Sequence, residues 1–248
     1  MPDVRLNPEA TSRFQKRIDK YTKSEFKQEG TIHVTNLLWC LQKAVFRLKN
    51  PVDETPSRWM VHGTLTHKSV EPILAEEFSS QTEQAVTEKK TQWNGITGTI
   101  DLMGAVPLEF KTSEYGTVRP WYVEQLMSYC VMTGHKTGLL VTWAEGRKAD
   151  DPHIEVAVYN VRFTERELED WSQVMLDRKN LILGGVTSDE PLPESEINRK
   201  PFECRTCPYG SECPYYVYSY RTKAGIVLVA EPFKDPARKR KIGVFDSI

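Results

Sequence analysis

The chain has 248 residues, of which 39% are hydrophobic and 27% charged, and its formal net charge is −1. This composition predicts a folded protein, and the near-zero net charge excludes a uniformly basic surface, so any nucleic acid must be bound by local basic patches. No apolar run is long enough to span a membrane and no signal peptide is visible, which predicts a cytoplasmic protein with no membrane partner.

The N-terminal part, residues 1–56, is predicted to be a helical arm. Residues 1–30 are rich in charged and amide side chains, which favours a surface helix or a partly ordered segment. From Thr35 to Leu48 apolar residues recur at helical spacing, which predicts an amphipathic helix with Thr35 as its N-cap. Cys40 lies one residue off the apolar stripe, and such a lone cysteine is most often a small buried hydrophobe.

A second helix is predicted from Arg58 to Phe78, and it carries a candidate metal ligand. His67 and Glu71 are four residues apart in the sequence, so both side chains lie on one face of this helix. Pro72 inside the pattern predicts a kink or a restart of the helix. On its own, His67 reads as a half-buried histidine with a backbone partner, but with carboxylates beside it an imidazole also binds manganese-type ions.

A hairpin with charged residues follows, formed by strands near 93–102 and 108–112 around Gly104. Asp101 closes the first strand. Glu109 and Lys111 are two apart in the second, so they face the same side while Phe110 points into the core. Two carboxylates beside an ammonium suit Mg²⁺ or Mn²⁺. An ordinary hairpin with solvated charges is the plainer alternative.

The rest of the core is predicted to alternate helices and strands. A helix from Trp121 to Thr133 ends at Gly134, and it places Gln125 and Tyr129 on one face. Strands are predicted at 138–143 and 154–163. This alternation predicts an α/β fold with one mixed sheet flanked by helices.

The C-terminal part contains a cysteine cluster. A capping box at Thr164 opens a helix that is predicted to end at Gly184, followed by a surface linker over 184–200. The spacing of Cys204, Cys207 and Cys213 is a strong signal for a bound metal or cluster. Cys40 and Cys130 are the candidates for a fourth ligand, and we favour Cys40 because Cys130 is predicted to lie in the core. Tyrosines at 215–220 and a basic run at 236–241 either contact nucleic acid or serve packing and solvation.

Four residue pairs occur in an order that resembles the RecB-type branch of the PD-(D/E)xK nucleases: Gly63 and His67, Gly98 and Asp101, Glu109 and Lys111, and Gln125 and Tyr129. The resemblance implies a restriction-endonuclease-like core at 57–185. It implies a Mn²⁺ or Mg²⁺ site made by His67, Asp101, Glu109 and the carbonyl of Phe110, with Glu71 as a weaker candidate. Lys111 would activate or orient the attacking water, and Gln125 and Tyr129 would support the substrate and the lysine.

The cysteine layout resembles that of the Cas4-family iron–sulfur nucleases. This implies a [4Fe–4S] cluster on Cys40, Cys204, Cys207 and Cys213, in a subdomain formed by residues 1–56 and 186–248; the spacing alone also suits zinc. The implied activity is a metal-dependent DNA exonuclease acting on single strands or overhangs, 5′ to 3′, for CRISPR spacer acquisition with Cas1 and Cas2 as partners. The alternatives are a stand-alone or viral RecB-like repair nuclease and a non-catalytic DNA-binding module.

Overall fold

The computed structural model describes residues 9, 12–13, 16–17, 30–52, 58–79, 84–113, 117–145, 154–198, 201–204, 207–222, 225–230 and 240–245. Its centre is a six-stranded mixed sheet in the order β1-β3-β4-β5-β6, with β2 paired to β3. Pairs β1/β3 and β4/β5 are parallel and the others are antiparallel. The strands are β1 (Ile32–His33), β2 (Val86–Trp93), β3 (Ile96–Met103), β4 (Pro107–Ser113), β5 (Thr137–Glu145) and β6 (Ile154–Arg162). The predicted mixed α/β sheet is confirmed.

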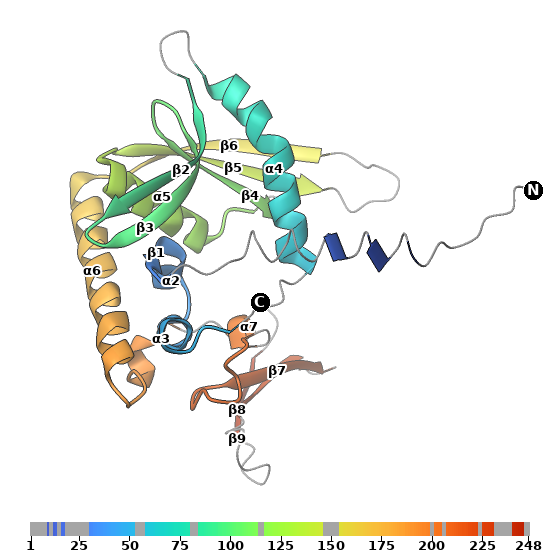
Figure 1. Ribbon diagram of the computed structural model, residues 1–248, viewed down its shortest axis with the longest axis vertical. Helices are drawn as coiled ribbons and strands as arrows, with labels where there is room; N and C mark the ends of the chain where they lie inside the picture. Colours follow the sequence, from blue (N-terminus) through green and yellow to red (C-terminus); the bar gives the residue numbers. More distant parts are fainter. Residues whose placement is uncertain are drawn as a thin grey trace, which may run out of the picture.

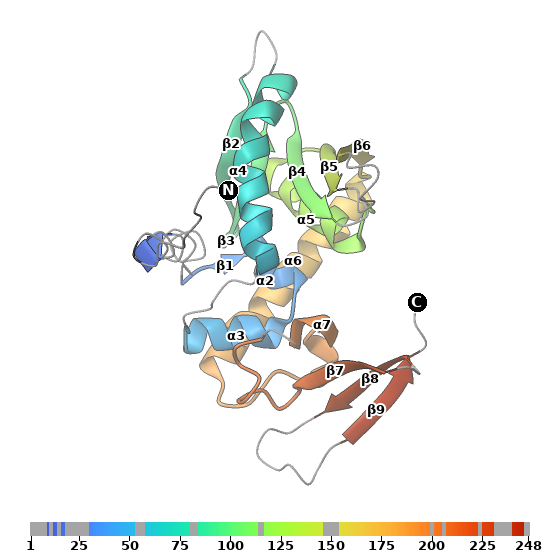
Figure 2. The same ribbon diagram turned by 90° about the vertical axis from the view of Figure 1, so that its right-hand side faces the viewer.

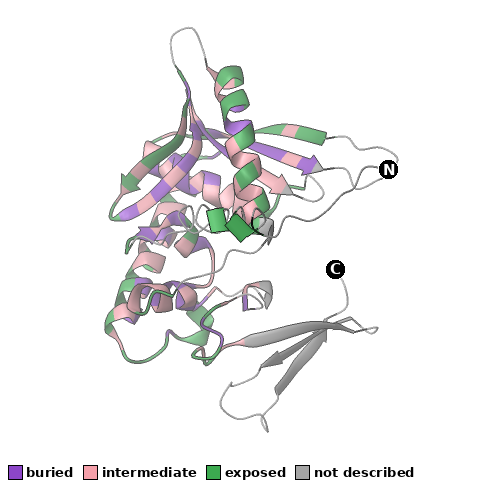
Figure 3. Cartoon of the chain, turned by 45° about the vertical axis from the view of Figure 1, so that its right-hand side comes forward, coloured by how far each residue is buried: buried purple, intermediate pink, exposed green. Residues whose placement is uncertain are grey.

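Helices cover both faces of this sheet (Figures 1 and 2). One face is covered by α4 (Arg58–Phe78), which packs Val70 and Leu74 against Leu102, Leu108 and Phe110. The other face is covered by α5 (Pro120–Thr133), behind which lies the long α6 (Glu165–Thr187). Each fully buried aliphatic or aromatic side chain contributes about 1.5–3 kcal/mol, so these two apolar layers hold the sheet between them. Figure 3 shows buried residues in the central strands and in the helices that pack on them and below them.

The predicted single helix after Thr35 is wrong in one respect, because two helices meet there. They are α2 (Val34–Leu38), with His33 as N-cap, and α3 (Leu41–Lys49), with Cys40 as N-cap. At the start of α2, the side chain of Asn36 accepts from the His33 backbone N–H at 2.8 Å. At the break between the helices, the N–H of Leu41 donates to the carbonyl of Ile197 at 2.9 Å, and this long-range bond replaces the one that would continue α2. Cys40 therefore begins a helix.

Helix α4 runs through Pro72 without the predicted restart. Proline removes one backbone donor from a helix interior, at a cost of about 3 kcal/mol in an isolated helix. Here Val70 and Leu74 are buried on either side of it, and their packing on the sheet offsets that cost. Because the helix is continuous, His67 and the buried residues Val70 and Leu74 belong to one rigid element over the sheet.

Helix α6 does not end at Gly184 as predicted, but continues to Thr187 with Ser188 as its C-cap. The capping box at its start is confirmed, since the N–H of Glu167 donates to the Thr164 hydroxyl at 3.2 Å. Gly185 serves packing: a Cβ there would lie 2.7 Å from Val45 Cγ2 and 3.0 Å from Leu192 Cδ2. The glycine therefore allows α3 to approach α6 closely.

These neighbouring glycines give a matched test of packing. Gly185→Ala should destabilise the protein by about 1–3 kcal/mol, because the added methyl group overpacks against Val45. Gly184→Ala should stabilise it by up to about 1 kcal/mol, because its Cβ enters open space and alanine is the better helix former. Urea denaturation of the two variants measures both effects, and equal effects would contradict this view of the α3–α6 contact.

The predicted surface linker over 184–200 is also wrong in part. It contains a 3₁₀ turn, η1 (Glu194–Glu196), and its Leu192 and Ile197 are buried in the core with α2 and α3. The N–H of Leu192 donates to the Gln42 side chain at 2.8 Å, which ties the segment to α3. The segment is thus a structural bridge between α6 and the cysteine region.

Beyond this bridge lie α7 (Pro201–Cys204) and a three-stranded sheet formed by β7 (Val217–Thr222), β8 (Gly225–Ala230) and β9 (Arg240–Phe245). Most of residues 1–29 of the N-terminal arm, its residues 53–56, and residues 236–239 of the basic run fall outside the described residues. The division into 1–56, 57–185 and 186–248 stays a prediction. Among the described helices, none is long and apolar enough to cross a membrane.

Candidate functional site

The candidate site begins where β3 and β4 part. One edge of β3 pairs with β2, while the other is shared between β1, at Ile96 and Thr97, and β4, at Leu102 and Met103. Between these pairings the edge of β3 has no strand partner in the described part of the chain. The carboxylate of Asp101 lies in this interval and accepts a hydrogen bond from the N–H of Phe110, Oδ2 to N 2.8 Å. The Asp101 side chain thus takes the place of a backbone hydrogen bond between β3 and β4, and this contact fixes its carboxylate between the two strands.

Glu109 lies on β4 next to this opening and is completely buried, with 0% exposed. Its Oε1 forms an ion pair with the Nζ of Lys111, as expected for residues two apart on one side of a strand. Phe110 is also fully buried, in the α4 layer, so the predicted division between the two faces is confirmed. Oε2 of Glu109 has no hydrogen-bond partner among the described residues. Glu109 is therefore not a solvated surface charge, which excludes for this residue the alternative of an ordinary hairpin with solvated charges.

Helix α4 brings His67 to the same place. Its Nδ1 lies 3.7 Å from Oδ1 of Asp101 and 4.0 Å from Oε1 of Glu71. The imidazole also packs edge-on against the ring of Phe110, with centroids 4.8 Å apart, which fixes its orientation. The predicted shared face of His67 and Glu71 is confirmed, and an imidazole and an acid from distant parts of the chain meet.

Helix α5 closes the site from the other face. Gln125 donates from Nε2 to the Tyr129 hydroxyl at 3.0 Å, so this pair forms as predicted. A Cβ on Gly98 would lie 2.9 Å from Cε1 of Tyr129, so only glycine allows the tyrosine this close to β3. The sequence analysis missed Tyr122, whose ring centroid lies 5.8 Å from Nζ of Lys111. It is three residues before Gln125, a spacing that does indicate a shared face.

Burial and mutual repulsion set the charges at the site. Burial, and then the neighbouring Asp101, raise the pKa of Glu109 to about 8 despite the opposing effect of Lys111. Burial lowers the pKa of His67, which favours the neutral, metal-binding imidazole. Burial alone would lower the pKa of Lys111, but Glu109 and Asp101 outweigh it and raise that pKa. Lys111 is therefore an ammonium at neutral pH, suited to orienting a water and to neutralising charge, and not to accepting a proton.

The raised pKa of Glu109 predicts how the stability of the metal-free protein depends on pH. Between the ordinary carboxyl value of 4.5 and about 8 the native state binds more protons than the unfolded state. The contribution of Glu109 to the free energy of unfolding should therefore fall as pH rises through this window and level off above it. Urea denaturation in EDTA at pH 5, 6, 7 and 8 measures the slope. Glu109→Gln should flatten it, and an unchanged slope would contradict the assignment.

Other buried polar atoms without a hydrogen-bond partner lie near the same strands. Among the described residues these atoms include the hydroxyl of Thr142 and Nε1 of Trp143 on β5. Thr142 is the register partner of Lys111, and the ring of Trp143 lies 6.4 Å from that of Phe110. Unpartnered buried polar groups cost stability and are rare in native proteins, and their gathering near these strands is typical of functional sites. No sequence pattern indicated either residue.

The side chains of Asp101, Glu109 and His67 offer the kinds of donor atom that a hard divalent ion binds. A Glu109 oxygen without a hydrogen-bond partner among the described residues, the Asp101 carboxylate and the neutral His67 imidazole are donors of the types that bind Mn²⁺ and Mg²⁺. Within the part of the chain that the structure describes, no three His, Cys, Asp or Glu side chains already converge as a metal-binding group. Ligation by His67, Asp101, Glu109 and the carbonyl of Phe110 stays a prediction, and it requires side-chain rotation.

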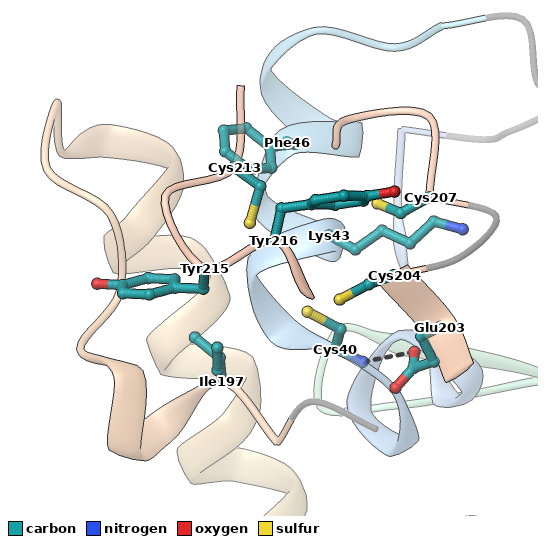
Figure 4. A pocket seen from close by; sticks show the side chains of 10 residues that line it. All are labelled: Cys40, Lys43, Phe46, Ile197, Glu203, Cys204, Cys207, Cys213, Tyr215 and Tyr216. Atoms are coloured by element: carbon teal, nitrogen blue, oxygen red, sulfur yellow. Dashed lines mark hydrogen bonds between the residues drawn. The ribbon is translucent and has the colours of Figure 1, made fainter. Parts of the chain in front are cut away.

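The cysteines form a second candidate site. Cys40, Cys204, Cys207 and Cys213 line one pocket, with Lys43 and Tyr216 in its wall (Figure 4). Cys130 is buried apart from them and its thiol lies 3.5 Å from the carbonyl of Thr137, so the preference for Cys40 agrees with the geometry. The four thiols line one pocket but do not converge as a metal-binding group among the described residues, so a four-thiolate metal or cluster there stays a prediction.

Glu203 contributes to this pocket and was missed in the sequence analysis. It accepts a hydrogen bond from the N–H of Cys40 at 3.0 Å and thereby joins the start of α3 to α7 (Figure 4). Burial is the main cause that raises the pKa of Cys40 to about 12, with further contributions from Glu203, Cys213 and Cys204. A bound cation would lower the pKa of Cys40 again, because it stabilises the thiolate that burial disfavours.

Comparison with known proteins shows the fold. No protein-family model and no curated protein matches the chain. The crystal structure of SSO0001 matches over 84% of this chain and 97% of that one, at a TM-score of 0.51 and 21% identity. LHK-Exo in complex with dAMP, an alkaline exonuclease from Laribacter hongkongensis, covers 63% of this chain and 90% of its own, at a TM-score of 0.49 and 14% identity.

A phage-related exonuclease from Haemophilus somnus 129PT covers 58% of this chain and 78% of its own, at a TM-score of 0.40 and 10% identity. The likenesses to these two exonucleases lie below a TM-score of 0.5. The likeness to SSO0001 extends over nearly all of that protein and shows a shared fold.

Proposed function

We propose that the protein is a RecB-like, metal-dependent DNA nuclease. The observation that carries this proposal is Glu109: a completely buried carboxylate with one oxygen paired to Lys111 and the other without a hydrogen-bond partner among the described residues. A fold does not retain such a group for stability, since burial of a charge is costly unless the charge is compensated. Asp101 acts on it electrostatically from β3, and His67 on α4 lies 3.7 Å from Asp101. A divalent cation would complete this set.

Each residue has a defined task in phosphodiester hydrolysis. Asp101, Glu109 and His67 would hold the cation, which lowers the pKa of a bound water and shields the negative phosphate. Lys111, as an ammonium, orients the attacking water and neutralises charge on the phosphate in the transition state. Gln125 holds the Tyr129 hydroxyl, and burial raises the pKa of Tyr129 well above its usual value, so this phenol remains protonated and able to donate.

We further propose that Cys40, Cys204, Cys207 and Cys213 hold a [4Fe–4S] cluster, with zinc as the alternative. Support comes from their shared pocket and from the resemblance of their spacing to the Cas4 family. The cluster would tie the N-terminal and C-terminal segments together. Anaerobic purification distinguishes the two: a brown protein with broad absorbance near about 400 nm indicates the cluster, and a colourless zinc-loaded protein refutes it.

The finer assignment follows from the same resemblance. In this proposal the protein is a cytoplasmic Cas4-type exonuclease that degrades single-stranded DNA or overhangs, 5′ to 3′, and prepares DNA for CRISPR spacer acquisition with Cas1 and Cas2. A stand-alone or viral RecB-like nuclease shares the same site residues. Co-purification with Cas1 and Cas2 supports the first role, and its absence with full nuclease activity favours the second.

Cleavage assays test the nuclease proposal. Purified protein is incubated with DNA oligonucleotides labelled at either end, in Mn²⁺, in Mg²⁺ and in EDTA. We expect metal-dependent hydrolysis, with products from a 3′-labelled strand shortening progressively if cleavage starts at the 5′ end. Binding without cleavage in either metal would instead identify a non-catalytic DNA-binding module.

A further inference from the structure

A chain of aromatic and cationic side chains leads away from the candidate active site. Its first link is Tyr122, whose ring lies 5.8 Å from Nζ of Lys111. Trp121 follows at 5.9 Å between ring centroids, with Arg119 5.8 Å from its ring. Trp39, beside Cys40, lies 5.9 Å from Trp121. These four residues, Trp39, Arg119, Trp121 and Tyr122, are here termed the aromatic track.

The aromatic track is accessible and spans two parts of the molecule. Arg119 is exposed, and the three rings are half-buried. Trp121 and Tyr122 belong to the first turn of α5, while Trp39 lies between α2 and α3, next to the cysteine pocket. Rings at such positions have a structural use, yet an apolar packing role requires neither an exposed guanidinium nor a ring beside the half-buried ammonium of Lys111.

We infer that the aromatic track binds the bases of single-stranded DNA next to the site of cleavage. This deepens the proposed nuclease function and rests on it for the choice of nucleic acid. Bases stack on aromatic rings whatever their sequence, and an arginine beside them contacts the phosphates and the rings. A duplex keeps its bases stacked on each other, so the track selects unpaired strands. The continuity from Lys111 through Tyr122 places the bound nucleotides beside the reacting phosphate.

Binding measurements on variants test the inference. With Ca²⁺ in place of Mn²⁺, fluorescence anisotropy gives the Kd for a labelled thymidine 20-mer and for a blunt duplex. Trp121→Leu should weaken single-strand binding about tenfold, the loss expected for one stacked base, and leave duplex binding unchanged. Arg119→Gln should weaken it and reduce the slope of log K against log salt by about 0.7. Tyr159→Leu, at an exposed aromatic on the edge strand β6, is the matched control and should bind as the wild type does.

The outcomes separate the two proposals. If Trp121→Leu binds and cleaves single strands as the wild type does, the aromatic track is refuted while the nuclease proposal stands. If the wild type cleaves nothing but Trp121→Leu still loses single-strand binding, the nuclease proposal fails while the track stands. Equal losses for single strands and duplex would overturn the claimed selection of unpaired bases.

An independent observation concerns Thr142. Its side chain is 1% exposed and its hydroxyl has no hydrogen-bond partner among the described residues. It is the register neighbour of Lys111 across the parallel β4–β5 pair, so the two side chains leave the sheet on the same face. We propose that Thr142 is a positioning residue. When Glu109 binds the divalent cation, the Thr142 hydroxyl accepts a hydrogen bond from the Lys111 ammonium. This role, too, rests on the proposed nuclease function.

Two readouts of opposite sign test this role. Thr142→Val should raise the Tm of the metal-free protein by about 2–4 °C, because it removes an unpartnered buried hydroxyl. The same change should lower kcat about tenfold with KM for DNA unchanged, and Thr142→Ser should restore kcat. A structural role predicts that stability and activity fall together. Full activity in Thr142→Val would overturn the proposal, and a wild type without activity would refute the nuclease function on which it rests.

Discussion

Glu109→Gln should reduce the rate of DNA cleavage about a thousandfold or more and leave the protein folded. A divalent ion supplies several kcal/mol of transition-state stabilisation, and each 1.36 kcal/mol is a factor of ten in rate. The amide removes the charge that holds the ion. Folding should survive, because burial raises the pKa of Glu109, so a neutral side chain of the same size costs the metal-free fold little, and the amide oxygen can still accept a hydrogen bond from Lys111. Single-turnover cleavage assays in Mn²⁺ measure the loss.

Asp170→Asn is the matched control. This acid on α6 is exposed and pairs only weakly with Arg166, 3.8 Å away, so its neutralisation should change neither rate nor stability. Glu109→Gln should still bind single-stranded DNA with near wild-type affinity. A cleavage rate within a few-fold of the wild type would remove Glu109 from the reaction, and loss of folding would show that its role is structural.

Cys204→Ala should release the bound metal or cluster and destabilise the protein more than any other single change considered above. A bound group that joins Cys40 to Cys204 closes a loop of roughly 160 residues, and loop closure of this size contributes about 5 kcal/mol to stability. For a chain of this length the corresponding loss in Tm is about 10–20 °C. Metal analysis and thermal unfolding of the anaerobically purified protein measure both effects.

Cys130→Ala separates loss of the bound group from loss of a buried thiol. Cys130 is fully buried outside the pocket, so this variant should keep its metal or iron content and lose only the packing of one sulfur atom. Retention of the bound group by Cys204→Ala, or its loss from Cys130→Ala, would contradict the proposed ligand set. A wild-type protein that purifies with neither iron nor zinc would contradict the pocket's proposed use altogether.

Those parts of the fold with strong local signals were predictable from the sequence. Glu109 and Lys111 are two apart in a strand, Gln125 and Tyr129 four apart in a helix, and these spacings alone determine which side chains share a face. The capping box at Thr164 and the stop at Gly134 are local hydrogen-bonding and backbone effects, and both are confirmed. The alternation of helical and strand patterns also predicted the mixed sheet.

Other features depend on contacts that no local pattern records. The helix break at Cys40 depends on Ile197 and Glu203, which are far away in the sequence. Gly185 remains helical because α3 packs on it. The depth of Glu109 follows from the parting of β3 and β4 and from the cover of α5, and Thr142 joins the site only through the β4–β5 register.

Crystals grown with Mn²⁺ test the central claim most directly, through an anomalous difference map. We predict a peak bounded by Asp101, Glu109 and His67, within about 2.0–2.4 Å of Oε2 of Glu109, and no such peak in Glu109→Gln crystals. If manganese binds only elsewhere while that oxygen stays without a partner, this carboxylate is not a metal ligand and the proposed nuclease mechanism is wrong.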